Sequence, residues 1–187
     1  MDKDQGRDTV IALALEDIET RGVRALSLPG LASRTGLSRA GIYRMFSGRD
    51  DLLGQLAARE MPAMVAAAMT EVDTDAATPD LVRGMVLFAL SYLRRHRALN
   101  RIRELEPDAL LPLVITRADT AQTAIELIAS HVAPVLADER HRRELVLPAG
   151  PAAELLVRIV LSHFLSESRC SDDASVAAAA ARAVCPA

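Results

Sequence analysis

Residues 31–46, LASRTGLSRAGIYRMF, join two short helix-compatible runs through a tight turn. The turn is Thr35-Gly36-Leu37-Ser38, in which the glycine is suited to end one helix and the serine to cap the next. Another glycine, Gly41, stands early in the second run, although glycine weakens a helix by about 1 kcal/mol relative to alanine. Two short helices joined in this way predict a helix-turn-helix motif.

The whole chain has a helix-forming composition. Half of its 187 residues are hydrophobic, which is enough for a sizeable core, but only 3% are aromatic and none is tryptophan. Runs of β-branched or aromatic residues that would favour strands are few. We therefore predict an all-α fold in which an N-terminal three-helix helix-turn-helix module precedes a larger helical bundle, with about nine helices in total.

Hydrophobic periodicity and capping residues place these helices along the chain. Pro62 is expected to kink or break one of them after Met61, and the PAGP sequence of residues 148–151 is expected to form a loop. Ser47 and Asp50 have the spacing of a capping-box-like helix start. The expected helices cover residues 7–20, 28–34, 39–46, 50–72, 80–95, 99–106, 108–115, 119–135, 152–167 and 172–184.

Positive charge is concentrated in the region of the motif. The chain carries a net charge of −3, yet no Asp or Glu occurs between Gly22 and Arg49. The same segment contains five arginines: Arg24, Arg34, Arg39, Arg44 and Arg49. A local positive region on a mildly acidic protein indicates a phosphate-binding face. Chance clustering in an arginine-rich chain is the alternative, and charge alone does not decide between them.

The second helix of the motif has one packed and one free face. Its spacing places Ile42 and Phe46 toward a core and leaves Arg39, Tyr43 and Arg44 toward solvent or a partner. In a helix-turn-helix this second helix enters the major groove of DNA. The small residues at positions 40 and 41 would allow close approach to base edges, and the capping serine could donate a hydrogen bond to a phosphate.

Residues 10–56, VIALALEDIETRGVRALSLPGLASRTGLSRAGIYRMFSGRDDLLGQL, resemble the DNA-binding module of the TetR (tetracycline-repressor-like) family of bacterial transcriptional regulators. The resemblance implies a helix-turn-helix DNA-binding domain over residues 1–49 and a helical ligand-sensing and dimerisation domain over residues 50–187. It also implies a cytoplasmic homodimeric regulator, usually a repressor, that binds a palindromic operator and is released by a small apolar or amphipathic inducer. The DNA-binding residues carried over are Ser27, Ser38, Arg39, Ala40, Gly41, Tyr43, Arg44 and Arg49.

The module departs from the family pattern at four places. Arg49 stands where the family usually has lysine, and Gly41 where a threonine is frequent. Met45 stands where an aromatic residue or histidine is common, and Pro29-Gly30 makes the first helix of the motif weaker than usual. These departures leave the operator sequence open. They also keep a second function possible in principle, an all-α small-molecule-binding or adaptor protein whose helix-turn-helix no longer reads DNA.

The larger domain of the family holds its ligand between the middle helices. Methionine and aromatic side chains in that part of the chain suit an adaptable apolar pocket, although ordinary core packing is the alternative for each. The segment LRRHRALNRIRELE, residues 93–106, has the composition of a solvated helix surface. The candidate ligand-binding residues are Met61, Met64, Met85, Phe88, Tyr92, His96, Leu110 and Ile125.

The last two predicted helices are candidates for the dimer interface. Residues 152–165 have a broad apolar face, and residues 175–185 are nearly all small, so a partner helix could approach closely. The alternative is that both helices pack within one subunit. The candidate interface residues are Leu155, Leu156, Ile159, Val160, His163, Phe164, Ala178 and Arg182.

Other functional classes receive little support from the sequence. The four histidines and two cysteines show no metal-ligand spacing, and we expect neither a metal nor a cofactor. Cys170 with His163 lacks the third group of a catalytic triad, so we expect no enzyme activity. Arg158 interrupts the best candidate for an apolar span, and the charged N-terminal residues MDKDQGRD lack the apolar run of a signal peptide. We therefore expect no membrane partner.

Overall fold

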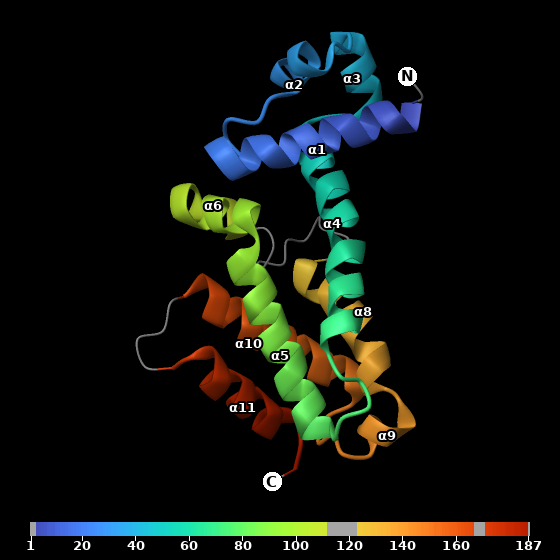
Figure 1. The fold of residues 1–187 in the computed structure, drawn as a ribbon, viewed down its shortest axis with the longest axis vertical. Helices are drawn as coiled ribbons and strands as arrows, with labels where there is room; N and C mark the ends of the chain where they lie inside the picture. Colours follow the sequence, from blue (N-terminus) through green and yellow to red (C-terminus); the bar gives the residue numbers. More distant parts are fainter. Residues whose placement is uncertain (1–2, 112–122, 167–170, 187) are drawn as a thin grey trace. The chain divides into compact units, whose positions relative to one another are not determined.

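The computed structural model describes residues 3–111, 123–166 and 171–186, and all regular secondary structure in these ranges is helical (Figure 1). The predicted all-α class is therefore confirmed. Among the described residues there are ten α-helices and one 3-10 helix, slightly more than expected. They are α1 (Lys3–Arg21), α2 (Leu28–Thr35), α3 (Arg39–Met45), α4 (Arg49–Glu71), α5 (Thr78–Arg95), α6 (Arg97–Leu105), η1 (Pro107–Leu110), α8 (Ala124–Leu136), α9 (Glu139–Arg142), α10 (Ala149–Leu165) and α11 (Asp173–Val184).

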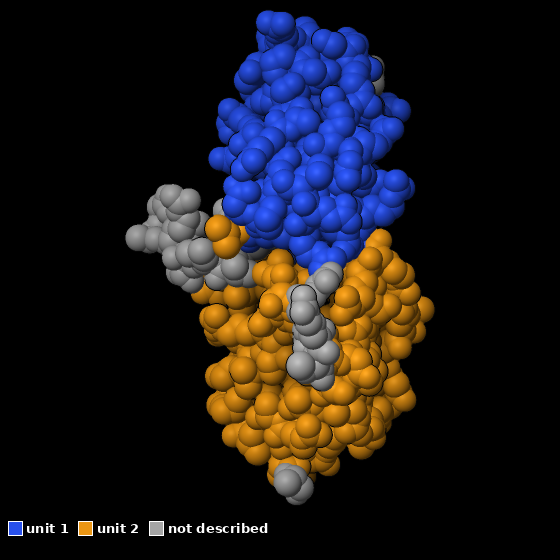
Figure 2. Space-filling view, turned by 90° about the vertical axis from the view of Figure 1, so that its left-hand side faces the viewer, with its two compact units in different colours: residues 1–64, 96–110 blue, residues 65–95, 111–187 orange. Residues whose placement is uncertain are grey.

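The chain divides into two compact units, coloured separately in Figure 2. Unit 1 consists of residues 1–64 and 96–110, and unit 2 of residues 65–95 and 111–187. Helix α4 contributes to both units, and helix α6 belongs to unit 1 although it follows α5 in the sequence. The two units are defined by which residues pack together. The predicted boundary between residues 49 and 50 instead separates a DNA-binding from a ligand-sensing domain, and it stays a prediction.

Unit 1 is built around helices α1, α2 and α3. Helix α1 packs against both α2 and α6, and α2 packs against α3. Its fully buried side chains include Ile18, Leu31, Ile42 and Phe46, which come from all three helices. Ala98 of α6 completes the same core. The helix-turn-helix thus rests on a continuous apolar interior, which fixes the orientation of its exposed surface.

Unit 2 is a bundle in which α10 packs mainly against α8, and α11 mainly against α5. The small side chains of α11 are what bring it close to α5, because Ala177, Ala180 and Ala181 are all buried. Leu81, Val82 and Leu90 of α5 lie in the same core. The small-residue face that the sequence offered to a partner helix is used within this chain.

Two predicted helix interruptions are wrong. Helix α4 continues through Pro62, whose side chain is exposed. Helix α10 begins at Ala149, inside the expected PAGP loop. Pro151 is tolerated there because the first amides of a helix have no intrahelical acceptor, so a missing N–H costs nothing. In the expected helix over residues 108–115, η1 ends at Leu110, and residues 112–115 lie outside the described ranges.

Candidate nucleic-acid interface

The two helices of the helix-turn-helix begin with the same local arrangement. The Ser27 Oγ accepts a hydrogen bond from the Gly30 amide at 3.2 Å, and the Ser38 Oγ accepts one from the Gly41 amide at 3.0 Å. Each serine therefore satisfies an amide that the helix itself leaves unpaired. Both serines remain exposed, so their hydroxyl hydrogens are available to an external acceptor such as a phosphate.

Glycine at the third helical position makes room for each cap. A Cβ at Gly30 would lie 2.8 Å from the Ser27 Oγ, and one at Gly41 would lie 3.1 Å from the Ser38 Oγ. The predicted role of Gly41, close approach of its backbone to base edges, requires an exposed residue. Gly41 is buried, so it does not have this role. Glycine occurs at position 41 because a side chain there would crowd the Ser38 cap at the start of α3.

Helix α3 presents the face that the sequence predicts. Ile42 is fully buried, whereas Tyr43 is 52% exposed. Arg39, Ala40 and Arg44 are also exposed. The turn before α3 is tight because Gly36 ends α2 with φ of 70°, a conformation that glycine adopts without strain. The exposed residues of α3 therefore form a single polar surface with one aromatic ring on it.

The positive charge of this surface is smaller than the sequence indicates. Arg24 donates to Asp108 at 2.7 Å, and Arg34 pairs with the buried carboxylate of Asp17. These two guanidinium groups join parts of unit 1 to one another. Arg39, Arg44 and Arg49 are exposed and make no side-chain hydrogen bond or ion pair within the described residues. Their charges are available to a polyanion.

Arg49 is the first residue of α4, whose start is closed by hydrogen bonds to Asp51. The Asp51 carboxylate accepts hydrogen bonds from the Ser47 amide at 2.8 Å and from the Gln55 side chain at 2.9 Å. The Gln55 and Ser47 hydrogen bonds lower the pKa of Asp51, so the carboxylate stays ionised. The capping-box spacing predicted that Asp50 would close this turn. The structure shows that Asp51 does so.

The candidate ligand-binding residues do not form one described site. Met61, Met64, His96 and Leu110 belong to unit 1, whereas Met85, Phe88, Tyr92 and Ile125 belong to unit 2. Within unit 2, the Phe88 and Tyr92 rings lie 5.8 Å apart. In unit 1, His96 caps α6 and its Nε2 lies 3.6 Å from the Glu60 carboxylate. Their role in ligand binding stays a prediction.

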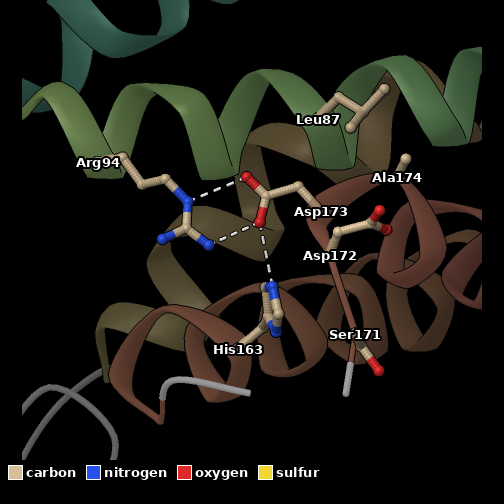
Figure 3. A pocket seen from close by; sticks show the side chains of 7 residues that line it. All are labelled: Leu87, Arg94, His163, Ser171, Asp172, Asp173 and Ala174. Carbon is tan, nitrogen blue, oxygen red and sulfur yellow. Dashed lines mark hydrogen bonds and ion pairs between the residues drawn. The ribbon is translucent and has the colours of Figure 1, made fainter. Parts of the chain in front are cut away.

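Unit 2 has an open polar hollow formed by other residues, shown in Figure 3. Arg94 of α5 and His163 of α10 both bind the Asp173 carboxylate at the start of α11, with distances of 2.6 Å and 3.0 Å. Leu87, Ser171, Asp172 and Ala174 complete its lining. The ion pairs join three helices, and this network is what engages His163.

Half of the predicted interface on α10 lies in the interior of the chain. Leu156, Val160 and Phe164 are at most 7% exposed, so they form the core and offer little surface to a partner. The periodicity of an apolar helix does not reveal which side is covered by its own chain. Leu155, Ile159 and Ala178 are half-buried and Arg182 is exposed, so these positions remain available to the predicted interface.

The described ranges contain no group of three or more His, Cys, Asp or Glu side chains suited to a metal ion. Cys185 is a buried free thiol, and burial raises its pKa. Cys170 lies outside the described residues. No helix in the described part of the chain is both long and apolar enough to cross a bilayer.

Comparison with known proteins agrees with this geometry. Residues 10–56 match the sequence profile of bacterial regulatory proteins of the tetR family. No curated protein matches the chain. Among solved structures, the TetR-family transcriptional repressor QsdR of R. erythropolis is 22% identical with a TM-score of 0.66, over 95% of this chain and 91% of QsdR.

Two further structures show the same fold. A putative TetR-family regulator from Vibrio parahaemolyticus is 23% identical, with a TM-score of 0.58, over 97% of this chain and 99% of its own. RolR, solved in complex with resorcinol, is 14% identical, with a TM-score of 0.67, over 97% of this chain and 88% of its own. The segment that matches the family profile, residues 10–56, ends in the first turns of α4 and contains the whole exposed surface of α3.

Proposed function

We propose that this chain, which carries the DNA-binding module of the tetR family on the fold of TetR-family regulators, is a ligand-responsive transcriptional repressor that acts as a homodimer. The observation that supports DNA reading most strongly is the exposed face of α3, where Tyr43 lies beside arginines that have no acidic partner in the described residues. Helix α3 would enter the major groove, and Arg44 and Arg49 would contact phosphates.

The serine caps and the charges are consistent with this role. Ser38 caps α3 through its oxygen lone pair and keeps its hydroxyl hydrogen for a phosphate. The positive end of the α3 dipole lies at the same place. Arg39 is the first residue of α3, so its guanidinium reaches the same surface. Backbone contacts of this kind would set the position of the helix, and Tyr43 and Ala40 would lie against the groove.

The released state would follow from ligand binding in the ligand-sensing domain that the sequence predicts over residues 50–187. RolR, a protein of this fold, holds resorcinol in its solved structure, which supports a small-molecule inducer for this chain as well. The inducer would be apolar or amphipathic, in keeping with the methionine and aromatic candidates. It must bind the DNA-free form more tightly than the DNA-bound form, because a ligand with equal affinity for both shifts no equilibrium.

A homodimer would use the surface of α10 and α11 that the rest of their own chain leaves uncovered. Leu155 and Ile159 on α10 are half-buried apolar residues on this surface. Two α3 helices related by a two-fold axis would read two half-sites about one helical turn of DNA apart.

The second candidate is a small-molecule-binding or adaptor protein that does not read DNA. The feature that favours it is the interrupted start of α2 at Pro29-Gly30. However, α2 forms despite this sequence, with Pro29 in its first turn and the Ser27 cap in place. The departure that weakened the DNA-reading interpretation is therefore accommodated by local structure.

Selection of duplexes from a random DNA library, followed by sequencing, tests the proposal. The full-length protein should enrich a two-fold symmetric sequence, which would establish DNA reading and dimeric binding together. The absence of enrichment at low salt, from a sample whose circular dichroism spectrum is helical, would contradict the proposal and favour the adaptor. An enriched sequence without two-fold symmetry would contradict the dimer alone.

A further inference from the structure

Helix α6 is joined by hydrogen bonds and an ion pair to the end of α1 and to the turn that connects α1 with α2. In sequence this helix has the composition of a solvated surface, but Ala98 is only 3% exposed and lies in the core of unit 1. Arg101 donates to the carbonyl of Thr20 at 3.0 Å, and Arg97 lies 3.4 Å from the Glu19 carboxylate. The last carbonyls of a helix lack intrahelical donors, so Arg101 supplies a partner that the end of α1 needs.

The most buried of these contacts is made by Glu106, the residue that caps the C-terminus of α6. Both of its carboxylate oxygens accept from the backbone amide of Arg24, at 3.1 Å and 3.0 Å. Glu106 is only 5% exposed. A buried carboxylate is costly unless it is hydrogen bonded, so its position depends on this amide, and the amide depends on it. Arg24 also reaches Asp108 in η1 with its side chain.

Gly22 leaves the space that this contact requires. Its φ of 82° is suited to glycine, and a Cβ at this position would lie 2.4 Å from the Glu106 Oε1. An alanine here could be accommodated only if the Glu106 carboxylate moved away, which would break the bond to Arg24. Gly22 therefore serves both to end α1 and to admit a side chain from α6.

We propose that Glu106 is a positioning residue for DNA binding, which keeps the α1–α2 turn ordered by fastening it to α6. The turn leads directly into α2, the first helix of the helix-turn-helix. If the turn loosens, ordering α2 and α3 on DNA costs conformational entropy that the fastened protein has already lost on folding. The inference rests on the proposed DNA-binding function and adds that a residue outside the DNA-binding face controls affinity.

The experiment measures the affinity of full-length variants for the duplex enriched by wild-type protein, at a temperature where circular dichroism shows each variant folded. Glu106→Ala removes the acceptor, and we expect affinity to fall about tenfold, as for loss of one hydrogen bond to a charged group. The dependence of affinity on salt should be unchanged, because no phosphate contact is removed. Glu106→Gln keeps one acceptor oxygen and should restore most of the affinity.

Two variants serve as controls for position and for backbone conformation. Glu144→Ala removes an exposed carboxylate of unit 2 that makes no ion pair within the described residues, and it should bind as wild type does. Gly22→Ala should weaken binding, and the double variant Gly22→Ala with Glu106→Ala should be no weaker than the weaker single variant, since both changes break one contact. Gly36→Ala, also at positive φ but with no atom within 4 Å of the added Cβ, gives the cost of the backbone strain in urea unfolding.

The outcomes separate the two proposals. Failure of wild-type protein to enrich any duplex would remove the DNA-binding function, and this inference with it, before any variant is made. Wild-type binding with unchanged affinity in Glu106→Ala would leave the function intact and overturn the inference. If Glu106→Ala does not fold, wild-type affinity in Gly22→Ala, whose added Cβ would displace the same carboxylate, would overturn it in the same way.

Discussion

His141 is almost fully buried, yet both nitrogens of its ring are hydrogen bonded. Its Nε2 lies 3.0 Å from the Thr74 carbonyl and its Nδ1 3.1 Å from the Thr78 hydroxyl. A carbonyl can only accept, so the Nε2 carries a hydrogen and donates it to the Thr74 carbonyl. The ring thereby ties α9 to the segment that precedes α5.

We expect His141→Ala to lower the free energy of unfolding by about 2 kcal/mol or more, because it leaves the buried Thr78 hydroxyl unsatisfied and opens a cavity. Urea unfolding followed by circular dichroism measures this loss. Arg142→Ala, at the neighbouring exposed position, should change stability by less than about 0.5 kcal/mol. Equal effects of the two substitutions would show that the His141 hydrogen bonds do not stabilise unit 2.

Asp173 makes the stability of unit 2 sensitive to acid. The hydrogen bond from Arg94, and then that from His163, lowers the pKa of the Asp173 carboxyl in the folded protein. A carboxyl whose pKa is lowered by folding stabilises the fold above its unfolded pKa, near 4, and this stabilisation is lost as the pH falls through the folded pKa.

Asp173→Asn should therefore lower stability at pH 7 and have a smaller effect at pH 3. Urea midpoints of both proteins at the two pH values give the comparison. An effect of Asp173→Asn that is the same at both pH values would contradict this account.

Single residues also show where sequence reasoning is sufficient and where it is not. Caps at Ser27 and Ser38 could be predicted because their partners lie three residues away. The ion pairs of Arg24 with Asp108 and of Arg34 with Asp17 could not be predicted, because each acid lies far from its arginine in the sequence. An acid-free segment therefore overstated the charge available to DNA.

At the scale of elements, α4 carries a proline that its sequence suggested would interrupt it. Pro62 cannot donate to the carbonyl four residues earlier, and its ring crowds that carbonyl. The helix continues nonetheless, with Pro62 exposed, so solvent can reach this part of the helix. The predicted break after Met61 is therefore wrong, and Pro62 remains a destabilising residue in the interior of the helix.

Pro62→Ala should raise the free energy of unfolding by about 1 kcal/mol or more, since alanine restores the hydrogen bond and removes the crowding. Thermal unfolding measures the gain. Pro79→Ala is the matched control, because Pro79 lies in the first turn of α5, where a missing amide costs nothing. A gain of the same size at both positions would be at odds with a specific cost in the interior of α4.

Helix boundaries were predictable where a cap marks them and less so where packing decides. Gly22 ends α1 in the left-handed region, as expected. The environment of α6 was not predictable, because its buried Ala98 and Glu106 stand among arginines that dominate its composition. What buries them is α1, which lies more than seventy residues earlier in the sequence.

At the scale of the whole molecule, the chain uses two separate segments to build the unit that carries the helix-turn-helix. A division by sequence assigns residues 96–110 to the ligand-sensing domain, whereas packing assigns them to unit 1. The motif and its exposed face could be predicted from local spacing. The dependence of that motif on α6 could not, since it arises from contacts between distant parts of the chain.

We propose that the exposed arginines of unit 1 that have no acidic partner among the described residues, such as Arg44, contact DNA, whereas the paired ones, such as Arg24, hold the unit together. The most direct test is the salt dependence of binding to the enriched duplex, compared for Arg44→Ala and Arg24→Ala. Each lost phosphate contact lowers the slope of log affinity against log salt by about 1. The account predicts this decrease for Arg44→Ala and an unchanged slope for Arg24→Ala. A wild-type slope in Arg44→Ala, or a decreased slope in Arg24→Ala, would contradict it.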